Sequence, residues 1–276
     1  MDPEKGQYGP TGRSLQSIGL SRKNLLVISS PVRSEIPEKA GWMTETDHEP
    51  ALRRKPAAPQ LLKLSVLFAV LTLPAMEVDG QLASSIAGWE RDTAWMQLLD
   101  VFRFAGSLPV LLAIGLLILL MDPSTRRPML RLLATLLTAA VITGLLKAVF
   151  SRQRPGSIDL DHPLWSSFPG LFDSLRSLQQ GESVLDWSLG GFPSGHVTSA
   201  VVTAMGLGWL YPRGRWLFAG IALLVAAQRL AFEHHFLSDL LAAVAVATLV
   251  AGVLASSRGP GAWFDRFELA GQPPDK

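Results

Sequence analysis

The sequence predicts an all-α, polytopic membrane protein with six transmembrane helices. Of its 276 residues, 48% are hydrophobic and only 17% are charged, and the mean hydropathy of +0.27 is too high for an ordinary soluble domain of this length. The apolar residues gather in six long runs. The formal net charge is only +2, without a basic patch interleaved with aromatic residues, so nucleic acid is not an expected partner. The absence of cysteine excludes disulfides and thiolate metal sites.

Three regions follow from this pattern. Residues 1–58 contain scattered proline, glycine and charge without a sustained period, which predicts a disordered cytoplasmic tail. The tail starts with acidic residues and its first long apolar run begins near residue 61, unlike a cleaved signal peptide. Residues 59–257 form the predicted six-helix membrane domain, and residues 258–276 a short cytoplasmic C-terminal tail.

A membrane-spanning helix needs about 20 mostly apolar residues. Six segments approach this length: 60–77, 104–121, 129–150, 195–211, 214–232 and 236–256. The second is the weakest, because its apolar core is short and must include residues 104–110. Residues 84–103 are apolar but interrupted by charges, which predicts an amphipathic helix in the membrane interface.

The basic residues predict the orientation, because Lys and Arg near helix ends favour the cytoplasmic side. They precede the first segment and fill the turns between the second and third and between the fourth and fifth: Arg53, Arg54, Lys55, Arg126, Arg127, Arg131, Arg213 and Arg215. The link between the first two segments is acidic or neutral, with Glu77, Asp79, Glu90 and Asp92. We therefore expect both termini inside and the 3–4 and 5–6 connections outside.

Three polar clusters lie at the predicted outer ends of the helices, where ionisable groups are functional candidates by default. The first is Lys147, followed by Arg152, Arg154 and Pro155. These cations could hold a multiply charged anion, with Arg supplying a planar fork for phosphate oxygens. The alternative is that they are snorkelling residues at a helix end.

The second cluster is the run from Gly190 to His196, directly before the fourth segment. Its glycines allow the backbone to approach a ligand, and a helix starting at Gly195 directs free N–H groups at an anion above it. Alternatively, Ser194 is a simple helix N-cap and His196 a partly exposed interface residue.

The third cluster surrounds the junction of the fifth and sixth segments and contains Arg229, Glu233, His234, His235 and Asp239. If the sixth helix starts near His235, Asp239 lies one turn further on the same face. A carboxylate there can bind one imidazole nitrogen and leave the other as a nucleophile or base. His234 matches this spacing less well. The alternative is a structural His–Asp pair capping the hairpin.

A metal site is the weaker interpretation of these residues. The adjacent histidines diverge on a helix, no H-E-x-x-H sequence occurs, and the surrounding cations would repel a divalent ion. We therefore expect neither a metal nor another cofactor.

In order and spacing, the clusters resemble the signature of the type 2 phosphatidic acid phosphatase (PAP2) superfamily: Lys-x6-Arg-Pro, Pro-Ser-Gly-His and Ser-Arg-x5-His-x3-Asp. Here these motifs read Lys147 to Pro155, Pro193 to His196 and Arg229 to Asp239. The resemblance covers about residues 60–257. It departs at Gln228, where the family has serine.

The resemblance implies a metal-independent phosphatase acting on a membrane lipid phosphate. It implies that His235 attacks phosphorus and forms a phosphohistidine, that Asp239 fixes its tautomer, and that His196 protonates the leaving oxygen. The implied phosphate-binding residues are Lys147, Arg154, Ser194, Gly195 and Arg229. Undecaprenyl diphosphate, phosphatidic acid, phosphatidylglycerol phosphate and lipid A phosphates all remain open as substrates.

The expected partners are a lipid substrate and the bilayer, and the expected location is a bacterial inner membrane with the site on its outer face. The connection 156–191 carries Trp165, Phe168, Phe172 and Trp187, which either guide the lipid as a lid or merely fix the loop. Competing functions are phosphoryl transfer to another lipid, a vanadate haloperoxidase, anion transport and a catalytically inactive scaffold. Transport is disfavoured because transporter sites usually lie at the membrane midplane.

Overall fold

The computed structural model describes residues 58–158, 167–170 and 190–269, and every regular element in these ranges is helical. The predicted N-terminal tail, apart from Ala58, lies outside the described residues. The principal helices are α1 (Ala58–Ala87), α2 (Ala94–Asp100), α3 (Leu108–Met121), α4 (Arg126–Phe150), α6 (Gly195–Leu210), α7 (Arg215–Ala231), α8 (Leu237–Ala255) and α9 (Pro260–Leu269). The short 3₁₀ helices include η3 (Val101–Gly106) and η5 (Pro155–Ser157). The predicted all-α class is confirmed for this part of the chain.

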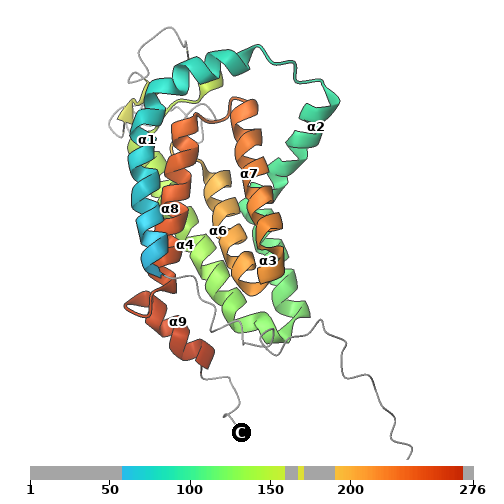
Figure 1. Ribbon diagram of the computed structural model, residues 1–276, viewed down its shortest axis with the longest axis vertical. Helices are drawn as coiled ribbons and strands as arrows, with labels where there is room; N and C mark the ends of the chain where they lie inside the picture. Colours follow the sequence, from blue (N-terminus) through green and yellow to red (C-terminus); the bar gives the residue numbers. More distant parts are fainter. Residues whose placement is uncertain (1–57, 159–166, 171–189, 270–276) are drawn as a thin grey trace, which may run out of the picture. The chain divides into compact units, whose positions relative to one another are not determined.

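The long helices form an antiparallel bundle in which α6 packs against α4, α7 and α8, while α1 lies along α8 (Figure 1). The approach of α1 to α8 depends on small residues. A Cβ atom at Gly252 would lie 3.0 Å from the Leu62 side chain and 3.2 Å from that of Leu61, and α8 buries several alanines. Small residues allow the close helix approach that membrane bundles use.

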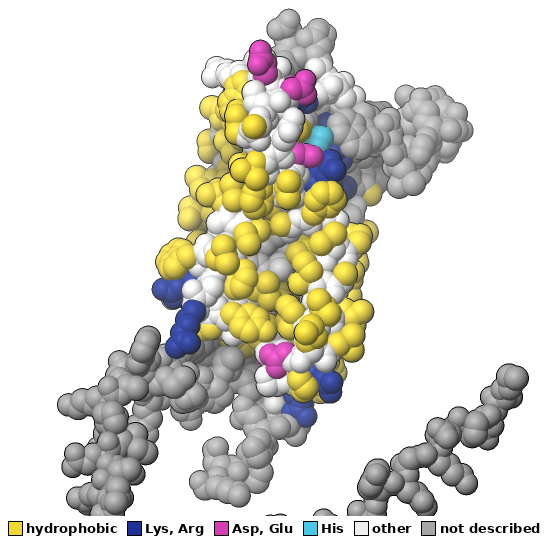
Figure 2. Space-filling model, turned by 90° about the vertical axis from the view of Figure 1, so that its right-hand side faces the viewer, with side chains coloured by type: hydrophobic (Ala, Val, Ile, Leu, Met, Phe, Trp, Pro, Cys, Tyr) yellow, Lys and Arg dark blue, Asp and Glu magenta, His cyan; other side chains and the backbone are white. Residues whose placement is uncertain are grey.

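Three described helices are long and apolar enough to cross a membrane: α1, the helical segment containing α4, and α8. A fourth span exists if residues Ala94–Gly106 and Leu108–Met121, which meet at a bend of 64°, count as one. The predicted segments 195–211 and 214–232 correspond to α6 and α7, which have 16 and 17 residues. Figure 2 shows hydrophobic side chains over the middle of one face, with charged side chains gathered towards its two ends.

The region between α1 and α3 differs from the expectation. Helix α1 continues to Ala87, so Asp79 lies inside it and is 1% exposed, rather than in an outer link. The predicted interfacial helix over 84–103 is replaced by the end of α1, a turn, the seven-residue α2 and η3. The predicted segment 104–121 breaks at Ser107, whose extended backbone makes it the N-cap of α3.

The predicted C-terminal tail contains α9, which packs against α4 and α8. Arg131 of α4 holds it: Nη2 lies 2.6 Å from Asp265 Oδ1 and 2.9 Å from the Gly261 carbonyl oxygen, and Nη1 lies 3.2 Å from Glu268 Oε2. The Arg131 side chain is only 7% exposed. This basic residue of a helix end is therefore committed to a buried ion-pair network.

Candidate active site

The three polar clusters meet at one end of the bundle. Lys147 lies in the last turn of α4, Arg154 precedes η5, and Ser194 is the N-cap of α6. Arg229 lies in the last turn of α7, and Asp239 in the first turn of α8. His235 lies in the turn that joins α7 to α8. The basic turns that begin α4 and α7 lie at the opposite end (Figure 1).

The His235 imidazole is 2% exposed, and its Nδ1 atom lies 2.7 Å from the carbonyl oxygen of Gly191. A carbonyl oxygen can only accept a hydrogen bond, so Nδ1 carries the ring proton. The Nε2 atom is consequently the nitrogen with the lone pair. This is the tautomer that a nucleophile or general base requires.

Asp239 does not occupy the expected place as the partner of the imidazole. Its Oδ2 atom lies 3.6 Å from His235 Nδ1, beyond hydrogen-bonding distance, and accepts the N–H of Phe236 at 2.8 Å. The physical reason is that α8 begins at Leu237, so His235 stands outside the helix and Asp239 caps its first turn. The hydrogen bond from Nδ1 to Gly191, rather than one to Asp239, therefore fixes the tautomer.

Positive charges surround the histidines. Burial lowers the pKa of His235 well below its ordinary value of 6.5, and the charges of Lys147, Arg154 and Arg229 lower it further. The hydrogen bond to Gly191 raises this pKa, but its effect is smaller than that of burial. Burial and the neighbouring Arg229, Arg154 and Arg91 lower the pKa of His234 to about 4. Both imidazoles are therefore neutral at physiological pH, the state in which an imidazole can act as a nucleophile or base.

The start of α6 provides neutral donors beside these cations. Its first helical hydrogen bond runs from the Thr198 N–H to the Ser194 carbonyl at 3.0 Å, so the N–H groups of the preceding residues, including Gly195, have no helical partner. Ser194 is fully buried, and its Oγ atom has no hydrogen-bond partner among the described residues. Lys147 donates from Nζ to the Gly190 carbonyl and packs near Gly195. Such a group of donors suits an anion.

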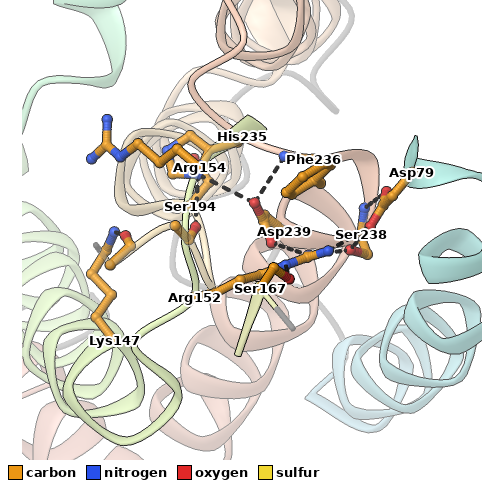
Figure 3. A network of polar contacts seen from close by, with 12 residues as sticks. Asp79, Lys147, Arg152, Arg154, Ser167, Ser194, His235, Phe236, Ser238 and Asp239 are labelled. Atoms are coloured by element: carbon orange, nitrogen blue, oxygen red, sulfur yellow. Dashed lines mark hydrogen bonds and ion pairs between the residues drawn. The ribbon is translucent and has the colours of Figure 1, made fainter. Parts of the chain in front are cut away.

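Arg152, which the sequence grouped with the possible anion-binding cations, instead makes contacts inside the protein (Figure 3). Its guanidinium is fully buried and bonded to Asp79, Ser167, Ser238 and Asp239. An anion above the site cannot reach it. No feature of the sequence indicated this contact, because Asp79 follows the predicted first segment (60–77) and was expected in the outer link.

Gln228, the residue that departs from the family pattern, is fully buried and turned towards α2. Its Nε2 atom donates to Asp100 Oδ1 at 2.9 Å, and Asp100 also pairs with Arg103 at 3.1 Å. The charges of Asp100 and Arg103 reach the neighbouring Arg229. Gln228 therefore ties the α2–η3 segment to the helix that carries Arg229.

His196 is half-buried in the first turn of α6, where the charges of Arg229 and Lys147 act on it. The η3 segment packs closely over it, since a Cβ atom at Gly106 would lie 2.9 Å from His196 Cβ.

Of the four loop aromatics, only Phe168 is described. It packs edge-on against Phe150 and Phe192 and over the Arg152 guanidinium, as a fixed part of the site's wall.

A metal would need ligands that this end of the bundle does not group. Within the described ranges, no set of three or more His, Asp or Glu side chains is arranged to hold one. The potential ligands His235 and Asp239 are already engaged by Gly191 and Arg152.

Comparison with known proteins gives two findings. Residues 128–260 match the family model described as "PAP2 superfamily", which confirms the predicted resemblance over that region. The fold is similar to the crystal structure of a transmembrane PAP2-type phosphatidylglycerolphosphate phosphatase from Bacillus subtilis, with 17% sequence identity and a TM-score of 0.48, over 79% of this chain and 99% of that one. No curated protein matches the chain.

Proposed function

We propose that this chain, whose residues 128–260 match the PAP2 superfamily, hydrolyses the phosphate or diphosphate of a membrane lipid through a phosphohistidine on His235. The observation that carries the proposal is the setting of His235. Its Nδ1–H donates a hydrogen bond to the Gly191 carbonyl oxygen at 2.7 Å, and the charges of Lys147, Arg154 and Arg229 act on the ring. A neutral nucleophile among fixed cations suits attack on a phosphate.

Phosphoryl transfer requires positioning and charge neutralisation above all. Lys147, Arg154 and Arg229 would neutralise the non-bridging oxygens, and Ser194 Oγ and the Gly195 N–H would donate to them. Ser194 is suited to this role because its hydroxyl is buried without a partner among the described residues. These cations would replace the magnesium that many phosphoryl-transfer enzymes use, so the proposed reaction needs no metal.

In the first step, the His235 Nε2 lone pair forms a bond to phosphorus while the bond from phosphorus to the lipid oxygen breaks. The bound phosphate anion favours the protonated form of His196. His196 donates this proton to the leaving oxygen, and the lipid alcohol or monophosphate departs. In the second step, neutral His196 takes a proton from water as the water oxygen bonds to phosphorus. The N–P bond breaks, inorganic phosphate leaves, and both histidines return to their starting states.

An apolar groove supports a lipid substrate. It has a volume of about 930 Å³ and is lined by α1, α6, α7 and α8. Leu230 and Leu237 line it next to the turn that carries His235, whereas Trp209 and Trp216 line it towards the other end of α7. A hydrocarbon chain in this groove would bring its phosphate to the site.

The proposed placement has six spans, with α6 and α7 crossing as the short fourth and fifth. The site then lies on the outer face of a bacterial inner membrane, because the basic turns at Arg126 and Arg213 lie at the opposite end of the bundle.

The test is phosphate release by the purified full chain from a panel of lipid phosphates in detergent, with EDTA throughout. We expect release that survives EDTA, is lost in His235→Ala and persists in His234→Ala. A ³²P label should appear transiently on the wild-type protein and be stable to alkali but labile to acid. Label recovered in another lipid instead of inorganic phosphate would identify a phosphotransferase. Absence of release, or its loss with EDTA, would overturn the proposal.

A further inference from the structure

Arg152 has an unusual environment for an arginine at a helix end. Its side chain is 0% exposed, and the rings of Phe236 and Phe168 lie 4.2 and 4.6 Å from its guanidinium carbon. Burying a cation is costly unless its donors are paired, and four pairings are made. Nε lies 3.2 Å from Ser167 Oγ, Nη1 lies 2.6 Å from Ser238 Oγ and 2.5 Å from Asp239 Oδ1, and Nη2 lies 3.0 Å from Asp79 Oδ2.

The two carboxylates that Arg152 joins come from opposite ends of the sequence. Asp79 lies in α1 and Asp239 in α8, and both side chains are 0% exposed. Asp79 also accepts the Ser238 N–H at 3.0 Å and the Ser238 hydroxyl. One cation thus stands between two buried anions, and Arg152 connects α1 to the first turn of α8.

Arg152 also reaches the other partner of the nucleophile, through its backbone. Its carbonyl oxygen accepts the Gly191 N–H at 2.7 Å, while the Gly191 carbonyl accepts the His235 Nδ1 proton at 2.7 Å. Its side chain holds Asp239, whose Oδ2 lies 3.6 Å from the same Nδ1. The two groups nearest to the protonated ring nitrogen are therefore both held by Arg152.

This arrangement has a consequence for the reaction. When Nε2 bonds to phosphorus while Nδ1 keeps its proton, the ring acquires positive charge. Asp239 is the carboxylate placed to stabilise that charge. The effect of Asp239 on the ring depends on how much of the carboxylate charge Arg152 neutralises. Asp79 limits this neutralisation, because it pairs with the same guanidinium.

We propose that Arg152 and Asp79 form a positioning pair that orients Asp239 and Gly191 around His235 and sets the negative charge beside the ring. The inference rests on the proposed function, because it concerns the nucleophile of that reaction. Neither residue touches the substrate. Both act through Asp239, and Arg152 also acts through Gly191.

Two substitutions separate this role from simple structural support, because they shift the charge beside His235 in opposite directions. Arg152→Gln leaves two anions without their cation, which should move the acid limb of kcat/KM to higher pH. Asp79→Asn removes one of the two carboxylates that pair with Arg152, so Arg152 cancels more of the Asp239 charge. This should move the acid limb to lower pH. The other charged or titratable groups that act on the ring are unchanged in both variants: Lys147 in α4, Arg154 before η5, His196 in α6, and Arg229 in α7.

Each substitution should also lower kcat by about tenfold or more, as the loss of a group that orients a reactive histidine typically does, with KM within about threefold. Arg152→Lys should restore the acid limb, because lysine keeps the positive charge. It should recover only part of kcat, because an ammonium cannot reproduce the planar set of donors of the guanidinium. Arg131→Gln is the matched control: it removes a buried arginine between two carboxylates at the opposite end of the bundle, and should change neither kcat nor the limb.

All variants are compared as full chains in detergent, with the thermal unfolding midpoint recorded for each. Opposite shifts of the acid limb, with kcat reduced, establish the inference. If Arg152→Gln does not fold, Asp79→Asn decides, and an unmoved limb or unchanged kcat in that variant overturns the pair's role. Wild-type protein that releases no phosphate overturns the proposed function itself, so the two failures are distinguishable.

Discussion

The Gly191 carbonyl oxygen and the His235 Nδ1 atom lie 2.7 Å apart, although 44 residues separate them in the chain. This hydrogen bond, rather than one from Asp239, determines which ring nitrogen carries the proton. The proposed nucleophile therefore depends on the backbone position of Gly191, which a substitution at Gly191 would shift.

Gly191→Ala should lower kcat about tenfold or more. A Cβ atom there would lie 3.1 Å from the Arg152 carbonyl oxygen and 3.3 Å from that of Gln153, so the loop must shift and the hydrogen bond to His235 must weaken. Steady-state kinetics on one lipid phosphate measures the effect.

Gly220→Ala is the control for that substitution. A Cβ atom at Gly220, inside α7, would meet nothing within 4 Å, and replacing a helical glycine with alanine should stabilise the fold by about 0.5–1 kcal/mol. Equal kcat in Gly191→Ala and wild type would refute the role assigned to the Gly191 carbonyl.

Protein stability should fall as the pH drops below 6.5. His234 and His235 are neutral in the folded state because their pKa values are lowered, to about 4 for His234. Unfolding restores both to about 6.5. The unfolded state then binds more protons than the folded state, so this stability is complete above pH 6.5 and is lost as the pH falls towards 4 and below.

Thermal unfolding midpoints in detergent between pH 7.5 and 5 measure this loss. The double variant His234→Ala/His235→Ala should lose less stability over the same interval. An identical slope in wild type and double variant would show that other groups cause the pH dependence.

Ala226→Trp should reduce kcat/KM for long-chain lipid phosphates by about tenfold or more. Ala226 lines the apolar groove, and an indole there would displace two or three methylene groups of a bound chain, each of which contributes about 0.8 kcal/mol. A short-chain, water-soluble phosphate ester should be hydrolysed within about twofold of the wild-type rate.

Leu217→Trp is the matched control on the same helix, because Leu217 is 66% exposed and does not line the groove. It should leave both substrates unaffected. An equal loss for long and short substrates in Ala226→Trp would contradict chain binding in the groove.

Arg131→Gln should release α9 without affecting catalysis. The substitution leaves Glu268, whose side chain is 1% exposed, without its cation, and breaking a buried pair typically costs about 3–5 kcal/mol. Amide hydrogen exchange should accelerate over residues 260–269 while kcat stays within about twofold. Unchanged exchange there would show that the packing of α9 against α4 and α8 holds it without these ion pairs.

Local sequence determined the positions of the helices in this protein. Long apolar runs predicted the helices that became α4, α6, α7 and α8 within a few residues, because burial from water depends on composition along one segment. They also predicted the start of α1, but α1 continues to Ala87, beyond the predicted end at residue 77. The weak second segment was less well predicted. The break at Ser107 and the short α2 and η3 depend on how this region packs against α6 and α7.

The chemical identity of the site was also present in the sequence. Lys147, Arg154, Ser194, His196, Arg229, His235 and Asp239 all lie at helix ends that alternate in direction, so an antiparallel bundle must bring them to one end. Their spacing within each motif is local, and could be recognised without knowledge of the fold.

The tertiary structure alone decided which of these groups face one another. Spacing suggested that Asp239 binds the His235 imidazole and that Arg152 is available to an anion. Instead, α8 starts after His235, the Gly191 carbonyl accepts the hydrogen bond from the ring N–H, and Arg152 is enclosed between Asp79 and Asp239. Hydropathy and motif spacing describe one segment at a time. These contacts join α1, the chain after α4 and the start of α8, so they form only when the separate segments pack together.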